Sequence, residues 1–189
     1  MYPFKTDINR VFFAHWNSFR VGASLPLLKD FLSRPEPRVQ SNVVIKDIPP
    51  NRKVHVRLHG TRLVELAGAD LTGQDLIEYS DTPQMAEDLW TFQRAVVDHP
   101  TGFAALKHTV TSSGRKLAFE ELSLPAIPFP GGLPCVIGCF ALLEEAADND
   151  TVSHVLTYSD AVWLDIGWGI PGREPPRTAR ADLRRAAGG

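Results

Sequence analysis

The spacing of apolar residues divides the chain into a helical start, two short strands, a helical middle and three longer strands. We expect the first helix over residues 7–20, where one apolar stripe recurs at spacings of four, four and three: Ile8, Phe12, Trp16 and Phe19. The stripe must be buried, either on the outer face of the chain's own sheet or against a second copy of the chain. The candidate contacts of a homodimer are therefore Phe12, Trp16 and Phe19.

Two strands follow, at 43–48 and 53–59, and the proline-rich turn between them predicts a hairpin. Alternation on the second strand separates two sets of side chains: Val54, Val56 and Leu58 on one face, His55, Arg57 and His59 on the other. The first set is expected to face the core.

The middle of the chain is predicted to be helical. A short helix over 61–66 ends near Gly68, and residues 70–73 form a turn. The longest helix begins with Thr82 as N-cap and Pro83 at its first position, a favoured arrangement, and it stops at residues 99–102. Its apolar side consists of Met85, Leu89, Phe92 and Val96.

Three strands complete the pattern, at 103–111, 116–127 and 134–143. The last one is apolar on both faces, which is typical of a central strand. In the first one, His108 shares a face with Leu106, so both are candidates for the lining of a pocket. The order of elements is therefore two strands, a helical block and three strands.

Charge and composition exclude several classes. The net charge of −2 and the pI near 6.3 provide no basic field that would attract nucleic acid or an anionic membrane surface. No run approaches the roughly 20 apolar residues that cross a bilayer, and the first residues lack a secretory signal pattern, so we expect a cytoplasmic protein without membrane insertion. Cys135 and Cys139, about 13 Å apart on one strand, cannot form a disulfide and should pack as small apolar residues.

The run VRLHGTRLVELAGADLTGQDL, at residues 56–76, resembles a family of small bacterial PAS-type sensory domains that carry R-L-x-G-T followed by L-T-G. His15-Trp16 and Leu25-Pro26 are similar to further features of that family, and the resemblance covers residues 16–145. It implies an α+β fold, in which a five-stranded antiparallel sheet has the last strand at its centre, helices on one face and a pocket between them, with the N-terminal helix and the C-terminal extension added. It also implies a signalling task rather than a catalytic one.

The motif residues are Arg57, Gly60, Thr61, Thr72 and Gly73. Gly60 and Gly73 are expected to adopt backbone geometry that other residues avoid, and Thr61 to cap the short helix. Arg57 is a candidate anchor for an acidic ligand group. The alternative is an ion pair with a nearby carboxylate such as Glu120 or Glu121.

The candidate pocket residues come from the strands and the long helix: Leu58, Met85, Leu89, Phe92, Val96, Leu106, His108, Phe119 and Phe140. A small-molecule ligand would bind among them. Periodic apolar residues also form ordinary cores, so a ligand-free protein interaction module is the alternative.

No cofactor is assigned, because the sequence argues against two that PAS domains carry. A flavin photosensor of the light-oxygen-voltage type needs a reactive cysteine on the helical side of the pocket, and both cysteines lie on the last strand. A haem-binding PAS domain takes its axial histidine from the long helix, which offers only His99 at its end, with His108 as the other candidate. His55 and His59 are too far apart on a strand to share one zinc ion, so no metal site is predicted.

Enzyme motifs are missing from the sequence, and Glu120 and Glu121, adjacent on a strand, should point to opposite faces. A lone general base in an isomerase- or dehydratase-like α+β enzyme remains a less favoured alternative. We divide the chain into an N-terminal helix and connector (1–40), a PAS-like domain (41–146), an apolar C-terminal extension (147–172) that docks on the domain or a partner, and a disordered tail (173–189). Signalling is then expected through contact with a partner protein.

Overall fold

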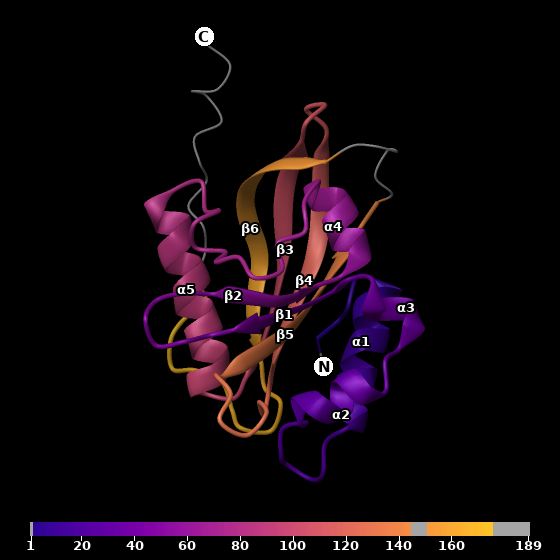
Figure 1. Cartoon of the computed structure of the whole chain (residues 1–189), viewed down its shortest axis with the longest axis vertical. Helices are drawn as coiled ribbons and strands as arrows, with labels where there is room; N and C mark the ends of the chain where they lie inside the picture. Colours follow the sequence, from indigo (N-terminus) through magenta and orange to yellow (C-terminus); the bar gives the residue numbers. More distant parts are fainter. Residues whose placement is uncertain (1, 145–150, 176–189) are drawn as a thin grey trace.

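The computed structural model describes residues 2–144 and 151–175 (Figure 1). Its helices are α1 (Asp7–Ser18), α2 (Leu28–Ser33), α3 (Pro37–Gln40), α4 (Thr61–Ala67) and α5 (Pro83–Asp98). Its strands are β1 (Val43–Asp47), β2 (His55–His59), β3 (Gly102–Thr111), β4 (Lys116–Ala126), β5 (Cys135–Leu142) and β6 (Val152–Leu164). They form one antiparallel sheet in the order β2-β1-β5-β4-β3-β6. The predicted α+β class with an antiparallel sheet is confirmed.

The strand β5 lies between β1 and β4 and is covered on both faces. Its side chains alternate between two apolar clusters, with Ile137 and Cys139 in one and Val136 in the other. The prediction of a central last strand of the core sheet is therefore correct, and the apolar run on both faces is its cause. Both cysteines are free and buried on this strand.

The sheet has six strands instead of the five expected. The additional strand, β6, comes from the C-terminal extension and pairs along the whole of β3. Aromatic rings join the extension to the domain, since Trp163 lies edge-on to Phe103 with ring centroids 5.5 Å apart. The Trp163 indole, near the end of β6, donates to the carbonyl of Arg173 in the segment that follows the strand, at 2.8 Å. The rest of the predicted tail, 176–189, lies outside the described residues.

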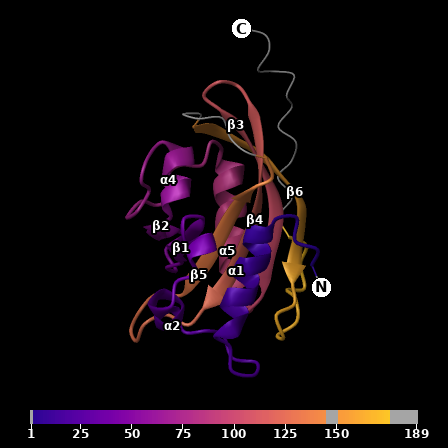
Figure 2. The same ribbon diagram turned by 90° about the vertical axis from the view of Figure 1, so that its right-hand side faces the viewer.

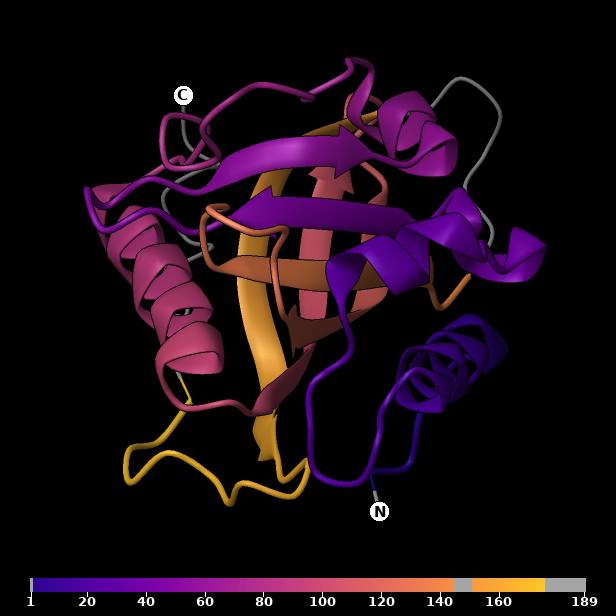
Figure 3. The ribbon, with the colours of Figure 1, turned by 60° about the horizontal axis from the view of Figure 1, so that its bottom comes forward.

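Helices pack on both faces of the sheet. Figure 3 shows α5 and α1 on opposite sides of the strands, and Figure 2 shows α1 in front of β4 and β5. The helix α1 has Thr6 as its N-cap, and the Thr6 hydroxyl accepts from the Asn9 backbone amide. The Trp16 indole donates to the Pro125 carbonyl at 3.0 Å, which fixes the helix on β4.

The apolar stripe of α1 is buried inside its own chain. Phe12 and Trp16 are each 0% exposed, in the cluster with the α1-facing side chains of β4 and β5. Phe19 is half-buried between the rings of His15 and Phe31. Of the two predicted ways to bury the stripe, the structure shows the first. Phe12 and Trp16 are thus not available to a second copy, which corrects their assignment as dimer contacts.

Gly60, rather than Thr61, is the N-cap of α4, and no side chain caps that helix. Gly60 has an ordinary backbone conformation, with φ of −63°, and not the unusual geometry expected from the sequence. A glycine is needed there because two backbone segments approach closely: a Cβ at Gly60 would lie 2.4 Å from the Ser41 carbonyl oxygen. Gly73 adopts the expected left-handed conformation, with φ of +83°. In the same turn, Thr72 donates from its amide and its hydroxyl to the Asp70 carboxylate.

Arg57 occupies a β-bulge. In the pairing of β1 with β2, Ile45 lies opposite Leu58 and Lys46 lies opposite Val56, so Arg57 is the extra residue. Its guanidinium forms an ion pair with Asp47 at 2.6 Å, and not with Glu120 or Glu121 as proposed from the sequence. The bulge also reverses the alternation of the strand, so that Val56 faces α4 whereas Leu58 packs on the α1 side.

Candidate ligand cavity

A cavity of about 340 Å³ lies between the sheet and the segment that runs from α4 to the first half of α5. All six strands contribute to its floor, and α4, the connection after it and α5 form its walls. The volume is within the range of about 300–1,000 Å³ that is usual for small-molecule sites. The walls are mostly apolar and include Leu63, Leu66, Leu71, Leu76 and Leu89.

The structure brings four of the predicted pocket residues to this cavity: Met85, Leu89, Phe119 and Phe140. Phe92 and Val96, from the second half of α5, lie instead in a filled core beside it. There the Phe92 ring stacks on Phe103 with centroids 4.4 Å apart, which leaves no space for a ligand. The cavity therefore occupies only one end of the interface between α5 and the sheet.

Leu58, Leu106 and His108 do not line the cavity, and in each case strand alternation is the reason. The bulge at Arg57 turns Leu58 to the α1 side. On β3 the residues that face α5 are the odd-numbered ones, such as Lys107, so Leu106 and His108 point to the other face. The His108 imidazole is engaged there by the Ser159 hydroxyl at 2.7 Å.

Charged residues on the cavity floor were not among the pocket residues predicted from the sequence. Lys46, Lys107 and Glu121 all line the cavity, and Lys46 and Glu121 are each 1% exposed. Lys46 Nζ lies 3.9 Å from Glu121 Oε1. Between them, Ser123 accepts from Lys46 at 3.4 Å and donates to Glu121 at 3.1 Å. The sequence signal that would have located them is a charged residue at an inward position of an otherwise apolar strand.

Burial controls the protonation of this floor. It lowers the pKa of Lys46 to about 8, against the opposing effect of the Glu121 carboxylate, and it also lowers the pKa of Lys107. Burial, followed by the charge of Glu121 and a hydrogen bond with it, raises the pKa of Tyr158 well above its ordinary value. Tyr158 is therefore a neutral hydroxyl on the floor.

The rim of the cavity carries two histidines and two aspartates. His59 Nδ1 accepts from the Leu71 amide at 3.2 Å, and burial lowers the pKa of its imidazole. His154 lies 3.5 Å from the Asp81 carboxylate, and Asp88 accepts from the Gln84 amide group at 2.8 Å. Each of these rim groups thus has a partner within the protein.

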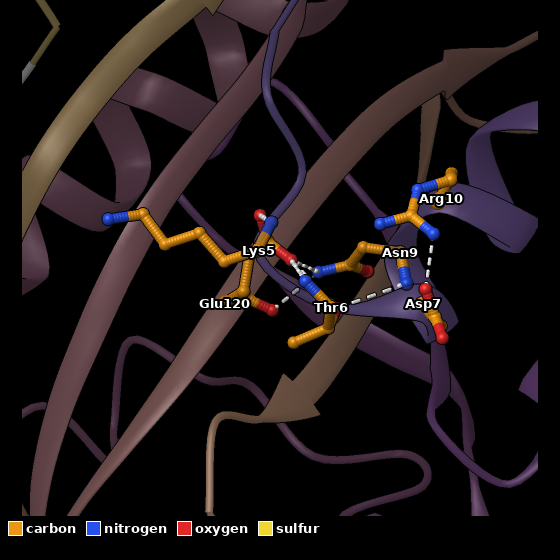
Figure 4. A network of polar contacts seen from close by, with 6 residues as sticks. All are labelled: Lys5, Thr6, Asp7, Asn9, Arg10 and Glu120. Carbon is orange, nitrogen blue, oxygen red and sulfur yellow. Dashed lines mark hydrogen bonds and ion pairs between the residues drawn. The ribbon is translucent and has the colours of Figure 1, made fainter.

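Glu120 serves the opposite face of the sheet, as predicted from the alternation of β4. Its carboxylate accepts from the backbone amides of Lys5 and Thr6 at 2.8 and 2.9 Å, and from the Thr6 hydroxyl at 2.7 Å (Figure 4). The Asn9 side chain adds a further donor at 3.2 Å. Glu120 is consequently a structural anchor of the N-terminal segment, and Glu121 is the carboxylate that faces the cavity.

Neither of the two cysteines lines the cavity, since both lie in the cluster on the α1 side. Burial raises the pKa of Cys135 to about 11 and also raises that of Cys139, so both are protonated thiols. Within residues 2–144 and 151–175, no group of three or more histidine, cysteine or acidic side chains is placed to hold a metal ion. No helix in the same described ranges is long and apolar enough to cross a membrane.

A family model described as the PAS domain matches residues 4–141. The match covers more than half of the chain, and the chain therefore belongs to the PAS domain family, a class of sensory and regulatory modules. A solved structure of a fungal LOV domain photoreceptor is 16% identical and covers 72% of this chain and 92% of its own, with a TM-score of 0.42. None of the curated proteins matches the chain.

Proposed function

We propose that this PAS protein binds a small molecule in the cavity between the sheet and α4–α5, and that it signals through contact with a partner protein. The observation that carries the proposal is a cavity of about 340 Å³ with apolar walls and a floor of buried charged side chains. Apolar walls around a few convergent polar groups are the usual composition of a ligand site.

The contrast within one interface supports a ligand over a ligand-free core. At the end of α5 near Phe92 and Val96, side chains fill the space between helix and sheet. At the other end, between Leu89 and Lys107, the space is open. A protein that used this interface only for packing would gain stability by filling both ends.

The route from the cavity to a partner is proposed to pass through β4. Glu121 faces the cavity, and its neighbour Glu120 holds the segment that leads into α1. A ligand that changes the position of Glu121 would change the strand on which α1 is anchored. Contact with a partner protein, or with a second copy of the chain through surfaces other than Phe12 and Trp16, would transmit that change. We expect this to take place in the cytoplasm.

Thermal stability in the presence of a metabolite library tests the proposal. A ligand at about 100 times its Kd stabilises the folded state by about 2.7 kcal/mol, which corresponds to a rise in Tm of about 5–10 °C. The matched variant Leu89→Trp narrows the cavity and should lose the shift, whereas Val21→Trp, at a side chain that is 82% exposed and outside the cavity, should keep it. Shifts that persist in Leu89→Trp would place binding elsewhere, and no shift with any compound would favour the ligand-free interaction module.

A further inference from the structure

We infer that the ligand is a small organic acid, whose carboxylate binds at Lys107 and Lys46 and whose compact apolar body lies between α4, α5 and the sheet. This inference rests on the proposed function and adds the chemical class of the ligand. Three observations carry it: the balance of charge on the floor, the state of Lys107, and the chemistry of the walls.

The charge of the floor is unbalanced. It holds two amino groups, on Lys46 and Lys107, and one carboxylate, on Glu121. Glu121 is already engaged through Oε1, which accepts from the Ser123 hydroxyl and lies 3.9 Å from Lys46 Nζ. One positive charge is therefore in excess wherever both lysines are protonated, and a buried charge without a counter-ion is unfavourable. A monoanionic ligand would remove the imbalance.

The excess positive charge is located at Lys107. Among the described residues, no hydrogen bond reaches its Nζ and no carboxylate lies within 4 Å of it, so the charges of Glu121 and Asp81 act on it only at longer range. Its ammonium lies over the Phe140 ring, 5.3 Å from the centroid, and faces the cavity. An ammonium group has three donors, and a cation–π contact satisfies none of them by hydrogen bonding. The geometry leaves these donors for a ligand.

The two aspartates of the rim, Asp81 and Asp88, do not serve as counter-ions to the Lys107 ammonium. Asp81 is partnered by His154 at 3.5 Å, and its side chain is 41% exposed, so water weakens its attraction for Lys107. Asp88 is engaged by Gln84 at the surface of α5. Both belong to the walls at the mouth, whereas Lys46, Lys107 and Glu121 belong to the strands of the floor.

The remaining walls define the body of the ligand. Around the charged floor, the lining is aliphatic and aromatic, with Val44, Val56, Leu63, Leu76, Phe119 and Phe140. These six side chains offer no hydrogen bonds to a sugar or a nucleotide. A short fatty acid or an arylacetic acid satisfies both the floor and the walls.

Isothermal titration of the full chain with paired probes tests the inference. The probes are hexanoate, octanoate and phenylacetate, each compared with its primary amide, which has the same shape without the charge. The wild-type protein should bind at least one acid about tenfold or more tightly than the corresponding amide. Amides that bind as well as their acids would overturn the anionic class and leave the binding cavity intact, and failure of every acid would also overturn it.

Two variants with opposite expected signs make the test specific. Lys107→Met retains the length of the side chain without its charge and should weaken acid binding about tenfold, while Glu121→Gln removes the competing carboxylate and should strengthen it by a similar factor. Lys116→Met, the same change at an exposed position of β4, is the control and should leave the affinity for the acids and for the amides unchanged. Weakening in both cavity variants, or in neither, would contradict the assignment. Circular dichroism of each variant reports whether it folds.

Discussion

Glu120 and Glu121 are consecutive residues of β4 whose carboxylates lie on opposite faces of the sheet. Glu120 accepts hydrogen bonds from the segment that starts α1, and Glu121 lines the cavity beside Lys46. Both are buried. One peptide unit thus joins the candidate ligand site to the N-terminal helix.

Glu120→Gln should lower the free energy of unfolding by about 2–3 kcal/mol, since hydrogen bonds to a buried charge are worth about 1.5–3 kcal/mol. Both carboxylate oxygens of Glu120 accept hydrogen bonds from donors of the N-terminal segment. In glutamine one of these oxygens is replaced by an NH₂ group, which donates and cannot accept, so the hydrogen bonds to that position are lost. Urea denaturation measures the loss. The control is Glu65→Gln, which breaks an exposed ion pair with Arg62 at 3.0 Å and should cost less than about 0.5 kcal/mol. Equal losses in the two variants would contradict the anchoring role of Glu120.

Phe12→Ala should destabilise the protein by about 3–5 kcal/mol, because the ring is fully buried between α1 and the sheet. Val21→Ala, at an exposed side chain, should stay within about 0.5 kcal/mol of the wild type. Thermal denaturation compares them. If Phe12→Ala kept full stability but altered the molar mass in light scattering, α1 would be an interface helix and its packing on the sheet would be wrong.

Two glycines of the motif should respond differently to alanine. Gly60→Ala brings a Cβ to within 2.4 Å of the Ser41 carbonyl oxygen, and the backbone must move, so we expect a loss above about 2 kcal/mol. In Gly73→Ala the new Cβ has no neighbouring atom within 4 Å. The free energy of unfolding should therefore fall only by about 1 kcal/mol, because alanine disfavours the φ of +83° at this position. Chemical denaturation of the two variants gives the order, and a larger loss at Gly73 would contradict the close contact of Gly60 with the Ser41 segment.

The buried amino group of Lys46 should make stability depend on pH. Its pKa is about 8 in the folded protein, compared with 10.5 as the ordinary value, so the folded state disfavours the proton. The resulting penalty is present in full below about pH 8 and is relieved as the pH rises toward 10.5. Stability should therefore rise from pH 8 to 9 by up to about 1.4 kcal/mol per pH unit from this group.

The difference between wild type and Lys46→Met isolates this contribution. Lys107 acts in the same direction, and Cys135, with its raised pKa, acts in the opposite direction above pH 9, but both are common to the two proteins. Glu121, Tyr158, His59 and Asp81 also face the cavity and are present in both proteins. Lys116→Met should keep the wild-type slope. An unchanged slope in Lys46→Met would mean that Lys46 is not buried as described.

Much of the fold followed from the sequence because periodicity reports burial. The apolar run of β5 identified a central strand, and Thr82-Pro83 located the start of α5. Bulges and pairing partners are set by tertiary contacts, and these caused the errors. The bulge at Arg57 reversed the face of Leu58, and the choice of the wrong face of β3 included His108 and omitted Lys107. The addition of β6 required knowledge of which strand edge it meets.

The site was predictable only in its apolar part. Met85, Leu89, Phe119 and Phe140 line the cavity because helix and strand periods place them inward. Lys46 and Glu121 are exceptions to the rule that charged residues are exposed, and their mutual contact is visible only in three dimensions.

Native mass spectrometry of the protein purified from its host tests the central claim most directly. Electrospray from volatile buffer preserves a ligand in an enclosed site, and denaturation of the same sample releases it for identification. We predict an added mass on the wild-type protein that is absent from Leu89→Trp and retained by Val21→Trp. A wild-type protein that carries no added mass, together with no shift of Tm in any metabolite, would contradict the claim that this PAS domain binds a ligand in the cavity beneath α4 and α5.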